Sequence, residues 1–301
     1  MKSSHMNGMA RTFVLMAAMT ALFGGIGLML GGTSGMILAL LFAAGTNMFA
    51  YWNSDKMVLK MHNARAISRS DAPDIYAMTE RLVNNANMPM PTLYIMDNEQ
   101  PNAFATGRNP QHGVVALTTG LMKRLNADEI EGVIAHELSH IKNRDSLIMT
   151  ITATIGGTIS TLANMSMFMG SDDRRLGAVG TIAVMIIAPL AASVVQMAIS
   201  RTREYAADRS GAEMSGKPLA LASALEKIQT MAQHIDNIPA ERSPASAQLF
   251  IINPLHKKSI DNLFSTHPNT ANRIAQLKDI AHNMGNQRFD DPQSIATGPW
   301  G

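Results

Sequence analysis

The chain has 301 residues, a formal net charge of only +2 and no cysteine. So small a charge argues against a nucleic-acid-binding protein, and the absence of thiols excludes disulfides and cysteine-bound metal. Any metal ion must therefore be held by His, Asp or Glu. The 24 methionines are scattered, and we interpret them as flexible apolar filler in helices.

The averages conceal four long apolar stretches that contain no Asp, Glu, Lys or Arg. Each is close to the roughly 20 residues that a helix needs to cross the hydrocarbon of a bilayer. Short connectors join the first stretch to the second and the third to the fourth, which predicts two antiparallel transmembrane hairpins. The alternative for each is a buried core helix, and it is strongest for the third stretch, which is rich in Thr and Ser. The four stretches are residues 12–30, 36–51, 146–169 and 176–199.

Lysine and arginine near the ends of these stretches predict their orientation, because cytoplasmic loops are enriched in both. The connector of the first hairpin carries no charge, whereas basic residues cluster at the opposite end of both hairpins. Arg174 and Arg175 in the second connector weaken the rule there, although Asp172 and Asp173 balance them. We therefore expect both termini on the cytoplasmic side. The basic residues on that side are Arg11, Lys56, Lys60, Arg65, Arg69, Lys142, Arg144, Arg201, Arg203 and Arg209.

The polar segments between and after the hairpins predict a mixed α+β domain. Residues 70–87 have the apolar spacing of an amphipathic helix, and 92–96 and 113–117 have the composition of short strands. Asn126 followed by Glu129 predicts a capping box at the start of a helix that runs toward residue 144. Downstream, the pattern predicts helices over residues 217–234 and 269–282, a loop over 236–248 and a flexible tail from 285.

The predicted helix after Asn126 contains His136-Glu137-Leu138-Ser139-His140. Side chains four residues apart lie on the same face of a helix, so His136 and His140 can bind one zinc ion. Zinc makes a bound water more acidic, and Glu137 is placed to take the proton as general base. The pattern predicts a zinc peptidase site with one Zn²⁺ per chain. The alternative is two surface histidines on a helix that leads into the membrane.

A zinc site of this kind needs a third protein ligand and keeps one position open. Asn143 and Ser146 stand where a longer motif would place Gly and His, so the ligand must come from elsewhere. If the second hairpin forms, its two ends meet, and Glu204 then lies beside His140. Asp208 follows Glu204 by one helical turn and is suited to accept the N–H of a ligand histidine. The alternative is a charged turn in which both acids pair with nearby arginines.

With these residues in place, the sequence resembles the HtpX family of bacterial membrane zinc endopeptidases, relatives of the CAAX prenyl proteases. The resemblance covers nearly the whole chain after its first six residues, which look like a cloning remnant. It implies an inner-membrane protein of four spans whose cytoplasmic active site cleaves misfolded or damaged membrane proteins in stress-linked quality control. It rests on the motif at 136–140, on Glu204 with Asp208, on the segment 102–105 and on the segment 265–268 with Arg273.

Further roles come mainly from this resemblance. An edge strand at 102–105 would pair with the backbone of the substrate. His267 would stabilise the oxyanion of the tetrahedral intermediate, although it could equally just precede a helix that starts at Pro268. Arg273 is expected to pair with an acid of the site, and Asp208 is the candidate. The edge strand would consist of Asn102, Ala103, Phe104 and Ala105.

Together these expectations describe a mainly α membrane protein with four transmembrane helices in two hairpins and an α+β, gluzincin-like catalytic domain. The metal would lie near the cytoplasmic interface, because His140 is close to the start of the third stretch. Membrane proteins with exposed loops, or unfolded polypeptides, would be the substrates, and the bilayer is a further partner. The expected segments are residues 1–11 (N-terminal), 12–52 (first hairpin), 53–145 (first catalytic part), 146–200 (second hairpin), 201–284 (second catalytic part) and 285–301 (tail).

Three rival functions remain. A membrane scaffold or chaperone with a structural zinc would not need Glu137, because this residue is not a ligand, so Glu137→Gln separates it from a peptidase. A metal transporter would need ionisable groups inside the bilayer, and the four apolar stretches contain no His, Asp or Glu. A narrower alternative, a prenyl-peptide protease, is permitted by the resemblance and is not decided by the sequence.

Overall fold

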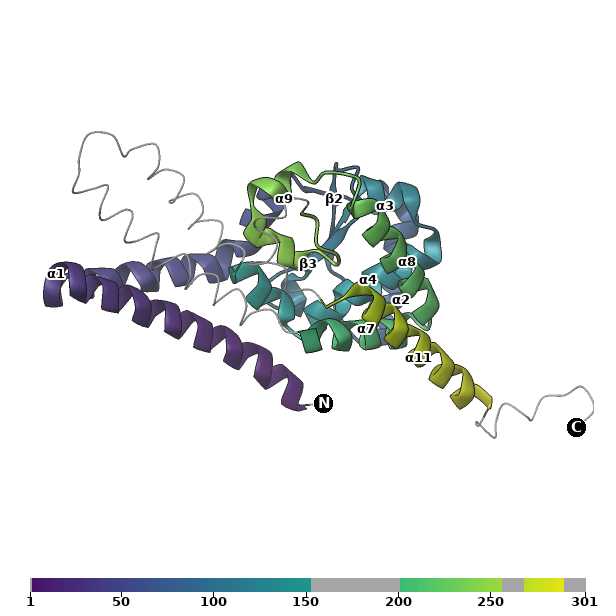
Figure 1. Cartoon of the computed structure of the whole chain (residues 1–301), viewed down its shortest axis with the longest axis horizontal. Helices are drawn as coiled ribbons and strands as arrows, with labels where there is room; N and C mark the ends of the chain where they lie inside the picture. The colour runs from purple at the N-terminus through teal and green to yellow at the C-terminus, as the bar shows by residue number, and fades with distance from the viewer. Residues whose placement is uncertain (1, 153–200, 256–267, 290–301) are drawn as a thin grey trace, which may run out of the picture.

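The structure, a computed structural model, describes residues 2–152, 201–255 and 268–289. Two regions differ in shape (Figure 1). A long helical hairpin, built by α1 (Lys2–Met61), projects from a rounded body that holds the strands and the other described helices. Helix α11 (Thr270–Phe289) leaves the body on the side away from the hairpin tip. We call the two halves of α1 the arms and the rest of the described chain the body.

The two arms are antiparallel because α1 breaks at Gly31 and Gly32. Gly32 has a positive φ of 59°, a conformation that glycine adopts without a steric penalty. Asn47 of the second arm ties the arms together by donating hydrogen bonds to the Met16 carbonyl and the Thr20 hydroxyl. The first two apolar stretches thus form a helical hairpin, with its turn inside the expected connector.

Among the described residues, one helical segment is long and apolar enough to cross a membrane, Gly31–Met61. The shorter segment Met16–Gly25 of the first arm is also apolar. Most of the second predicted hairpin, residues 146–200, lies outside the described residues. Only its first residues, 146–152, are described, and they form part of a helix. The structure is therefore mostly helical with a small mixed sheet, and the full set of four spans stays a prediction.

The body contains a four-stranded mixed sheet with the order β1–β2–β4–β3. β2 and β4 are parallel, whereas β1 pairs with β2, and β3 with β4, in antiparallel fashion. All residues of β3 and β4 are buried, which fits strands covered on both faces. β2 occupies the residues predicted for it, and β4 is shifted by one residue from its prediction. The elements are β1 (Arg65–Ala66), β2 (Thr92–Met96), β3 (Ala103–Thr106), the short 3₁₀ helix η1 (Pro110–His112) and β4 (Val114–Thr118).

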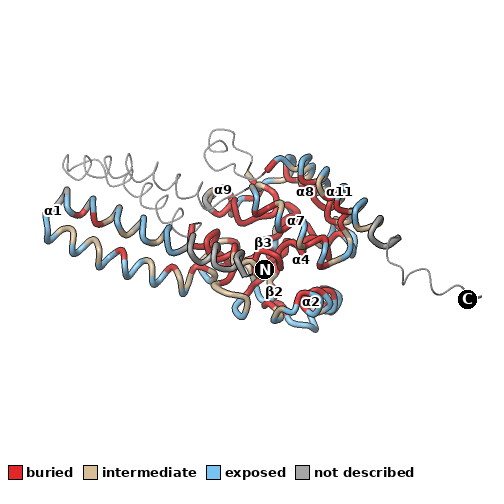
Figure 2. Tube along the Cα trace, turned by 90° about the horizontal axis from the view of Figure 1, so that it is seen from below, coloured by how far each residue is buried: buried red, intermediate tan, exposed pale blue. Residues whose placement is uncertain are grey.

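Helices pack around the sheet, and α4 lies at the centre of the body. The predicted capping box at its start is confirmed: the side chain of Asn126 accepts from the Glu129 N–H, and the Glu129 carboxylate accepts from the Asn126 N–H. Residues 129–141 of this helix are all buried, within the red core of the body (Figure 2). The body helices besides α11 are α2 (Pro73–Ala86), α3 (Thr119–Arg124), α4 (Ala127–Lys142), α7 (Arg201–Ser215), α8 (Pro218–Ala232), α9 (Ile238–Arg242) and the 3₁₀ helix η2 (Pro244–Leu249).

Two helix boundaries in the first half of the body differ from the predictions for local reasons. α2 begins at Pro73 rather than at residue 70, because the Ser68 N–H and hydroxyl donate to the Asp71 carboxylate in a turn that precedes it. α4 ends at Lys142, and Arg144 then adopts a positive φ of 59° that a continuing helix cannot contain.

In the second half, two predictions are wrong. The segment 236–248, expected as a loop, contains α9 and most of η2. Asn237 caps α9, since its side-chain oxygen accepts from the N–H of Ala240. The expected flexible tail from residue 285 is also wrong for its first residues, because α11 continues to Phe289.

Candidate metal centre

The centre forms where α4 packs against α7. Gly211 on α7 makes this contact close, because a Cβ there would lie 2.9 Å from the backbone nitrogen of His136. Gly132 on α4 likewise lets α8 approach, with a Cβ position 3.1 Å from the backbone of Leu221. Larger residues would push these helices apart. The two glycines therefore help to set the distance between the side chains that these helices carry.

Three predicted ligands meet in this interface. His136 and His140 lie one turn apart on α4, and their Nε2 atoms are 3.1 Å apart. Glu204, in the first turn of α7, places carboxylate oxygens 3.7 Å from His136 Nε2 and 3.6 Å from His140 Nε2. All three side chains are buried, and their ligand atoms lie within 4.8 Å of one another. Residues more than sixty positions apart in the sequence thus form one cluster.

A carboxylate faces the outer ring nitrogen of each histidine. Asp208 Oδ1 lies 2.9 Å from His136 Nδ1, and Asp145 Oδ2 lies 3.7 Å from His140 Nδ1. Asp208, at hydrogen-bond distance, keeps Nδ1 of His136 protonated and leaves the lone pair of its Nε2 for a metal, whereas Asp145 is too far from His140 for a direct hydrogen bond. The sequence predicts Asp208 at such a position, whereas Asp145 was not predicted. An acid five residues after His140, just beyond the end of the helix, is the signal that could have found it.

Arg273 on α11 adds a buried positive charge to the centre. It donates hydrogen bonds to both carboxylate oxygens of Asp208, from Nε at 2.8 Å and from Nη2 at 2.7 Å. Its Nη1 donates to the Ile251 carbonyl at 2.8 Å and lies 3.5 Å from Glu204 Oε2. Arg273 thus pairs with the acid that the sequence suggests for it, and it connects α11 to Asp208 and to the ligand Glu204 on α7.

The buried charges shift one another's pKa values. Burial by itself would raise the pKa of Asp208, but the Arg273 guanidinium and His136 hold it well below its usual range. Burial lowers the pKa of His136, which favours the neutral, ligating form of the ring. Burial also raises the pKa of Glu137 to about 8, with His140 opposing this effect and Glu204 adding to it. A carboxyl group with such a pKa can hold or release a proton near neutral pH.

The contacts of these side chains fit a metal ion. The two Nε2 atoms and the Glu204 carboxylate are lone-pair donors that face one another at short range. A proton between the two imidazoles would satisfy only one pair of these groups, whereas a divalent cation satisfies all three. Two imidazoles and one carboxylate are a frequent ligand set of catalytic zinc, which keeps its fourth position open.

Glu137 lies next to His136 on α4 and is only 1% exposed. The backbone amide of Ala105 faces its carboxylate, yet within the described part of the chain neither oxygen accepts a hydrogen bond of normal geometry. Buried carboxylates normally have hydrogen-bond partners. Glu137 therefore has the surroundings of a reactive group rather than of a structural one.

Comparison with known proteins agrees with this geometry. Residues 69–281, more than half of the chain, match peptidase family M48. The chain belongs to peptidase family M48. This M48 peptidase is therefore a zinc metallopeptidase, and the resemblance to the HtpX family is confirmed. The crystal structure of Ste24p from S. mikatae has a similar fold, with a TM-score of 0.50 and 15% sequence identity over 92% of this chain and 67% of that one.

The substrate strand predicted for this M48 peptidase at 102–105 corresponds to β3 at Ala103–Thr106, one residue later, and β3 lies at the edge of the sheet. Part of its outer edge is already paired within the chain. The Ile251 N–H donates to the Ala103 carbonyl at 3.0 Å, and the Asn102 side-chain amide donates to the Ile252 carbonyl at 2.9 Å. Because backbone groups alternate in direction along a strand, the next outward-facing N–H and C=O after Ala103 belong to Ala105.

One predicted site residue, His267, lies outside the described residues, and its role stays a prediction. The helix that it was expected to precede, α11, begins at Thr270.

Proposed function

We propose that this M48 peptidase binds one Zn²⁺ through His136 Nε2, His140 Nε2 and the Glu204 carboxylate. The meeting of these three buried groups, with ligand atoms within 4.8 Å of one another, is the observation that supports it. When bound there, zinc polarises the scissile carbonyl and acidifies the attacking water. Asp208 keeps His136 in the ligating tautomer, and Arg273 holds Asp208 in place through two hydrogen bonds.

Glu137 is the proposed general base. Its carboxylate is buried beside the ligands, and its raised pKa suits a group that takes a proton from water and returns it to the leaving amine. His267 remains the candidate for stabilising the oxyanion, a task that needs a donor near the scissile carbonyl.

The edge of β3 is the proposed docking strand for the substrate backbone. Ala105 presents the outward-facing groups nearest to the general base, so it would pair with the substrate beside the scissile bond. Asn102 and Ala103 are bonded to the segment 251–252. Phe104 packs inward, with its ring centroid 5.4 Å from that of Phe250. These three residues would position the strand rather than bind the substrate directly.

The arms of α1 support a location in the membrane. In the described part of the chain, ten of the twelve large apolar residues recorded as exposed lie on α1. Only 11% of the apolar stretch within Gly31–Met61 is buried by the rest of the protein. In water so large an apolar surface would drive association, whereas a bilayer covers it. We propose that residues 12–52 form one transmembrane hairpin and that residues 146–200 form a second.

The body is proposed to lie on the cytoplasmic side, with residues 53–145 and 201–284 forming one catalytic domain. Lys56, Lys60 and Arg65 at the body end of the second arm support this orientation, because the connector at the tip carries no charge. His140 lies five residues before the helical segment that leads into the second hairpin, so the metal would lie near the membrane surface. Substrates of this endopeptidase would be loops and extended termini of misfolded or damaged membrane proteins, in stress-linked quality control.

Co-reconstitution into proteoliposomes tests this function. The peptidase is combined with a destabilised membrane protein or with its stably folded parent, and tags on both enzyme and substrate report orientation. We expect zinc-dependent cleavage of the destabilised substrate only, within loops on the same side as the body. Equal cleavage of the folded parent, or cleavage of loops on the opposite side, would contradict the proposal.

A further inference from the structure

Strand β3 lies between two clusters of buried apolar side chains. Ala103 and Ala105 belong to the cluster that contains the apolar residues of α4, the helix that carries two metal ligands. Phe104 belongs to the second cluster, because side chains alternate between the two faces of a strand. This second cluster also contains residues from the end of the second arm and from the helical segment 145–152, which leads into the second proposed hairpin. The proposed docking strand therefore contacts the bases of both hairpins on the face opposite to α4.

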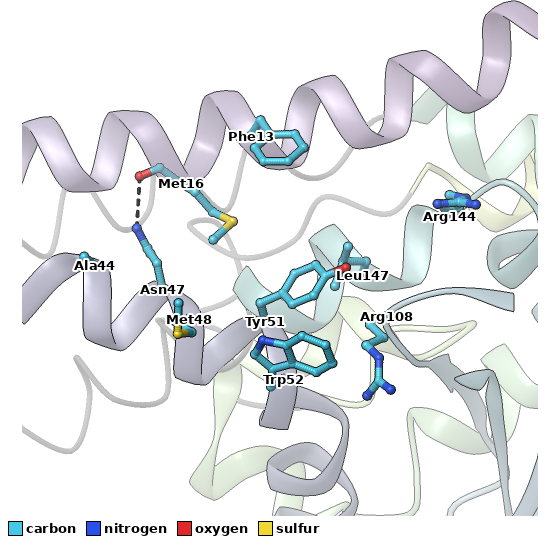
Figure 3. A pocket seen from close by; sticks show the side chains of 10 residues that line it. All are labelled: Phe13, Met16, Ala44, Asn47, Met48, Tyr51, Trp52, Arg108, Arg144 and Leu147. Atoms are coloured by element: carbon cyan, nitrogen blue, oxygen red, sulfur yellow. Dashed lines mark hydrogen bonds between the residues drawn. The ribbon is translucent and has the colours of Figure 1, made fainter. Parts of the chain in front are cut away.

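The two hairpin bases also meet each other. Tyr51 of the second arm and Leu147 of the segment 145–152 line one cavity of about 380 Å³ where the arms reach the body (Figure 3). Leu147 is a member of the second cluster, and Tyr51 packs against it. The two bases are thus neighbours beside β3.

One anchor holds Phe104 to the base of the second arm. His62, directly after α1, places its ring centroid 5.7 Å from that of Phe104 and 5.0 Å from that of Phe250. The Ser246 hydroxyl donates its proton to the Ser243 carbonyl at 2.7 Å, so it accepts from His62 Nε2 at 3.0 Å. This hydrogen bond fixes the orientation of the imidazole against Phe104.

A second anchor holds Thr106, the last residue of β3, to the segment 145–152. Its Oγ1 lies 2.8 Å from Thr150 Oγ1, and both side chains are buried. The Thr150 hydroxyl donates its own proton to the Ser146 carbonyl at 2.6 Å, so Thr106 is the donor within the pair. Both neighbours of Ala105 in β3 are therefore tied to a hairpin base.

We propose that Thr150 and His62 are positioning residues that hold the docking edge of β3 in place for the substrate. Thr150 acts through Thr106 on one side of Ala105. His62 acts through Phe104 on the other side. The inference rests on the docking role of β3 proposed above. A strand that is already ordered binds an extended peptide at lower cost than one that must be ordered on binding. The anchors contact β3 and not the metal ligands, so they should affect substrate affinity rather than the chemical step.

Steady-state cleavage of an unstructured casein peptide, labelled with a fluorophore and a quencher, by the zinc-loaded full chain in detergent tests the proposal. Thr150→Val removes the acceptor of Thr106 with little change in shape. We expect KM to rise about fivefold, the effect of one lost hydrogen bond, with kcat unchanged. Thr150→Ser keeps the hydroxyl and should keep the KM of the parent. Thr152→Val is the matched control, because this residue is just as buried and its hydroxyl donates to the Ile148 carbonyl in the same helix. It should leave KM unchanged.

The other anchor is tested by a binding measurement that needs no turnover. In the Glu137→Gln background, which should bind the peptide without cleaving it, fluorescence anisotropy gives the Kd. His62→Ala removes the ring contacts and the hydrogen bond and should raise Kd about tenfold. His62→Phe restores a ring beside Phe104 and should recover most of this loss. Zinc content shows that each variant is folded, and a folding defect in His62→Ala leaves Thr150→Val decisive.

Two results would overturn the inference: an unchanged KM in Thr150→Val, or a fall in kcat without a rise in KM. Ala105→Pro separates this failure from that of the docking strand, because it removes the outward N–H at an edge where proline is tolerated. If Ala105→Pro raises KM and Thr150→Val does not, β3 docks the substrate and only the anchoring role fails. If Ala105→Pro also leaves KM unchanged, the docking role of β3 fails, and the inference fails with it.

Discussion

The arms of α1 and the body expose and bury opposite kinds of side chain. In the body, apolar residues of the sheet and of α2, α4 and α8 form one continuous core, and the burial pattern of Figure 2 shows it as a red centre with a pale rim. Along the arms, by contrast, Ile37, Leu41 and Phe42 are more than half exposed. The same physical rule, that apolar groups avoid water, gives an amphipathic helix such as α2 in the body and a helix that is apolar on all sides in the arms.

Charged side chains of the body lie at its surface and, at the metal centre, also in its interior. Among the described residues, ion pairs such as Arg69 with Glu80 lie on the surface of the body, where water screens them. Glu204, Asp208 and Arg273 are instead buried in its interior. Burial of such charges is unfavourable unless partners or a metal compensate them. The body therefore buries charged groups where the proposed chemistry needs them, whereas no charged side chain is buried among the arm residues whose burial the structure describes.

Among the substitutions that test this contrast, we expect Glu137→Gln to have the largest effect, on catalysis. The substitution should lower kcat on casein about a thousandfold, because it removes the general base. Zinc content should stay at one per chain, because Glu137 is not a proposed ligand. Glu131→Gln makes the same change on the same helix, at a carboxylate that pairs with Arg81 and Lys217, and should leave kcat nearly unchanged. Full activity of Glu137→Gln would place the base elsewhere, and loss of zinc would make Glu137 a ligand.

Arg273→Met should have the largest effect on stability. It leaves Asp208 buried without its guanidinium partner, which is expected to cost about 4 kcal/mol of unfolding free energy. Arg69→Met removes an arginine from an exposed pair and should cost less than about 1 kcal/mol. Denaturant unfolding of the two variants in the same detergent measures the difference. Equal losses would mean that the buried pair contributes no more than a surface one.

Leu41→Arg tests whether the arms are built for hydrocarbon. Leu41 is 66% exposed and lies about 14 Å from the tip, near the middle of a bilayer. An arginine there should cost about 3 kcal/mol of insertion free energy. Leu219 on α8 is 57% exposed in the body, and Leu219→Arg should change stability by less than about 0.5 kcal/mol. The fraction of each variant that resists alkaline extraction from membranes is the measurement. A similar fraction for both would place the arms in water.

The parts of the fold that the sequence predicts well are those that depend on local pattern. β2 and the capping box of α4 follow from short-range composition, and the first hairpin follows from two apolar stretches separated by glycines. The meeting of Glu204 with His140 was predicted from topology, because a hairpin returns its two ends to the same place. In each case a few neighbouring residues, or one connection, determine the outcome.

The parts that were missed depend on contacts between distant segments. α9 and η2 are short and have no strong periodic pattern. The buried side chain of Gln100 supports this region from a distant segment: its amide nitrogen donates to the Ile235 carbonyl at 2.7 Å, and its amide oxygen accepts from the Asn237 side chain. The pairing of Ile251 with Ala103 closes part of the β3 edge from about 150 residues away. Nothing in the local sequence of 102–105 indicates this pairing, so the predicted substrate strand included residues that the chain itself already occupies.

His62 lies at the junction of the two regions, directly after the second arm. It is 5% exposed, its Nε2 lies 3.0 Å from the Ser246 hydroxyl, and its ring contacts those of Phe104 and Phe250. Burial lowers the pKa of His62 from 6.5 to about 4. Between these two values the unfolded chain binds the proton more readily than the folded one. The stability contributed by the neutral ring is therefore complete above pH 6.5 and is lost as the pH falls toward 4.

At pH 5 this loss should amount to about 2 kcal/mol relative to neutral pH. His62→Gln keeps a neutral donor for Ser246 and removes the titration, so the drop in Tm between pH 7 and pH 5 should be smaller in this variant than in the parent. His234→Gln, at an exposed histidine, is the control and should retain the full drop. If the Tm of His62→Gln falls between pH 7 and pH 5 by as much as that of the parent, the acid sensitivity arises at the buried acids of the metal centre.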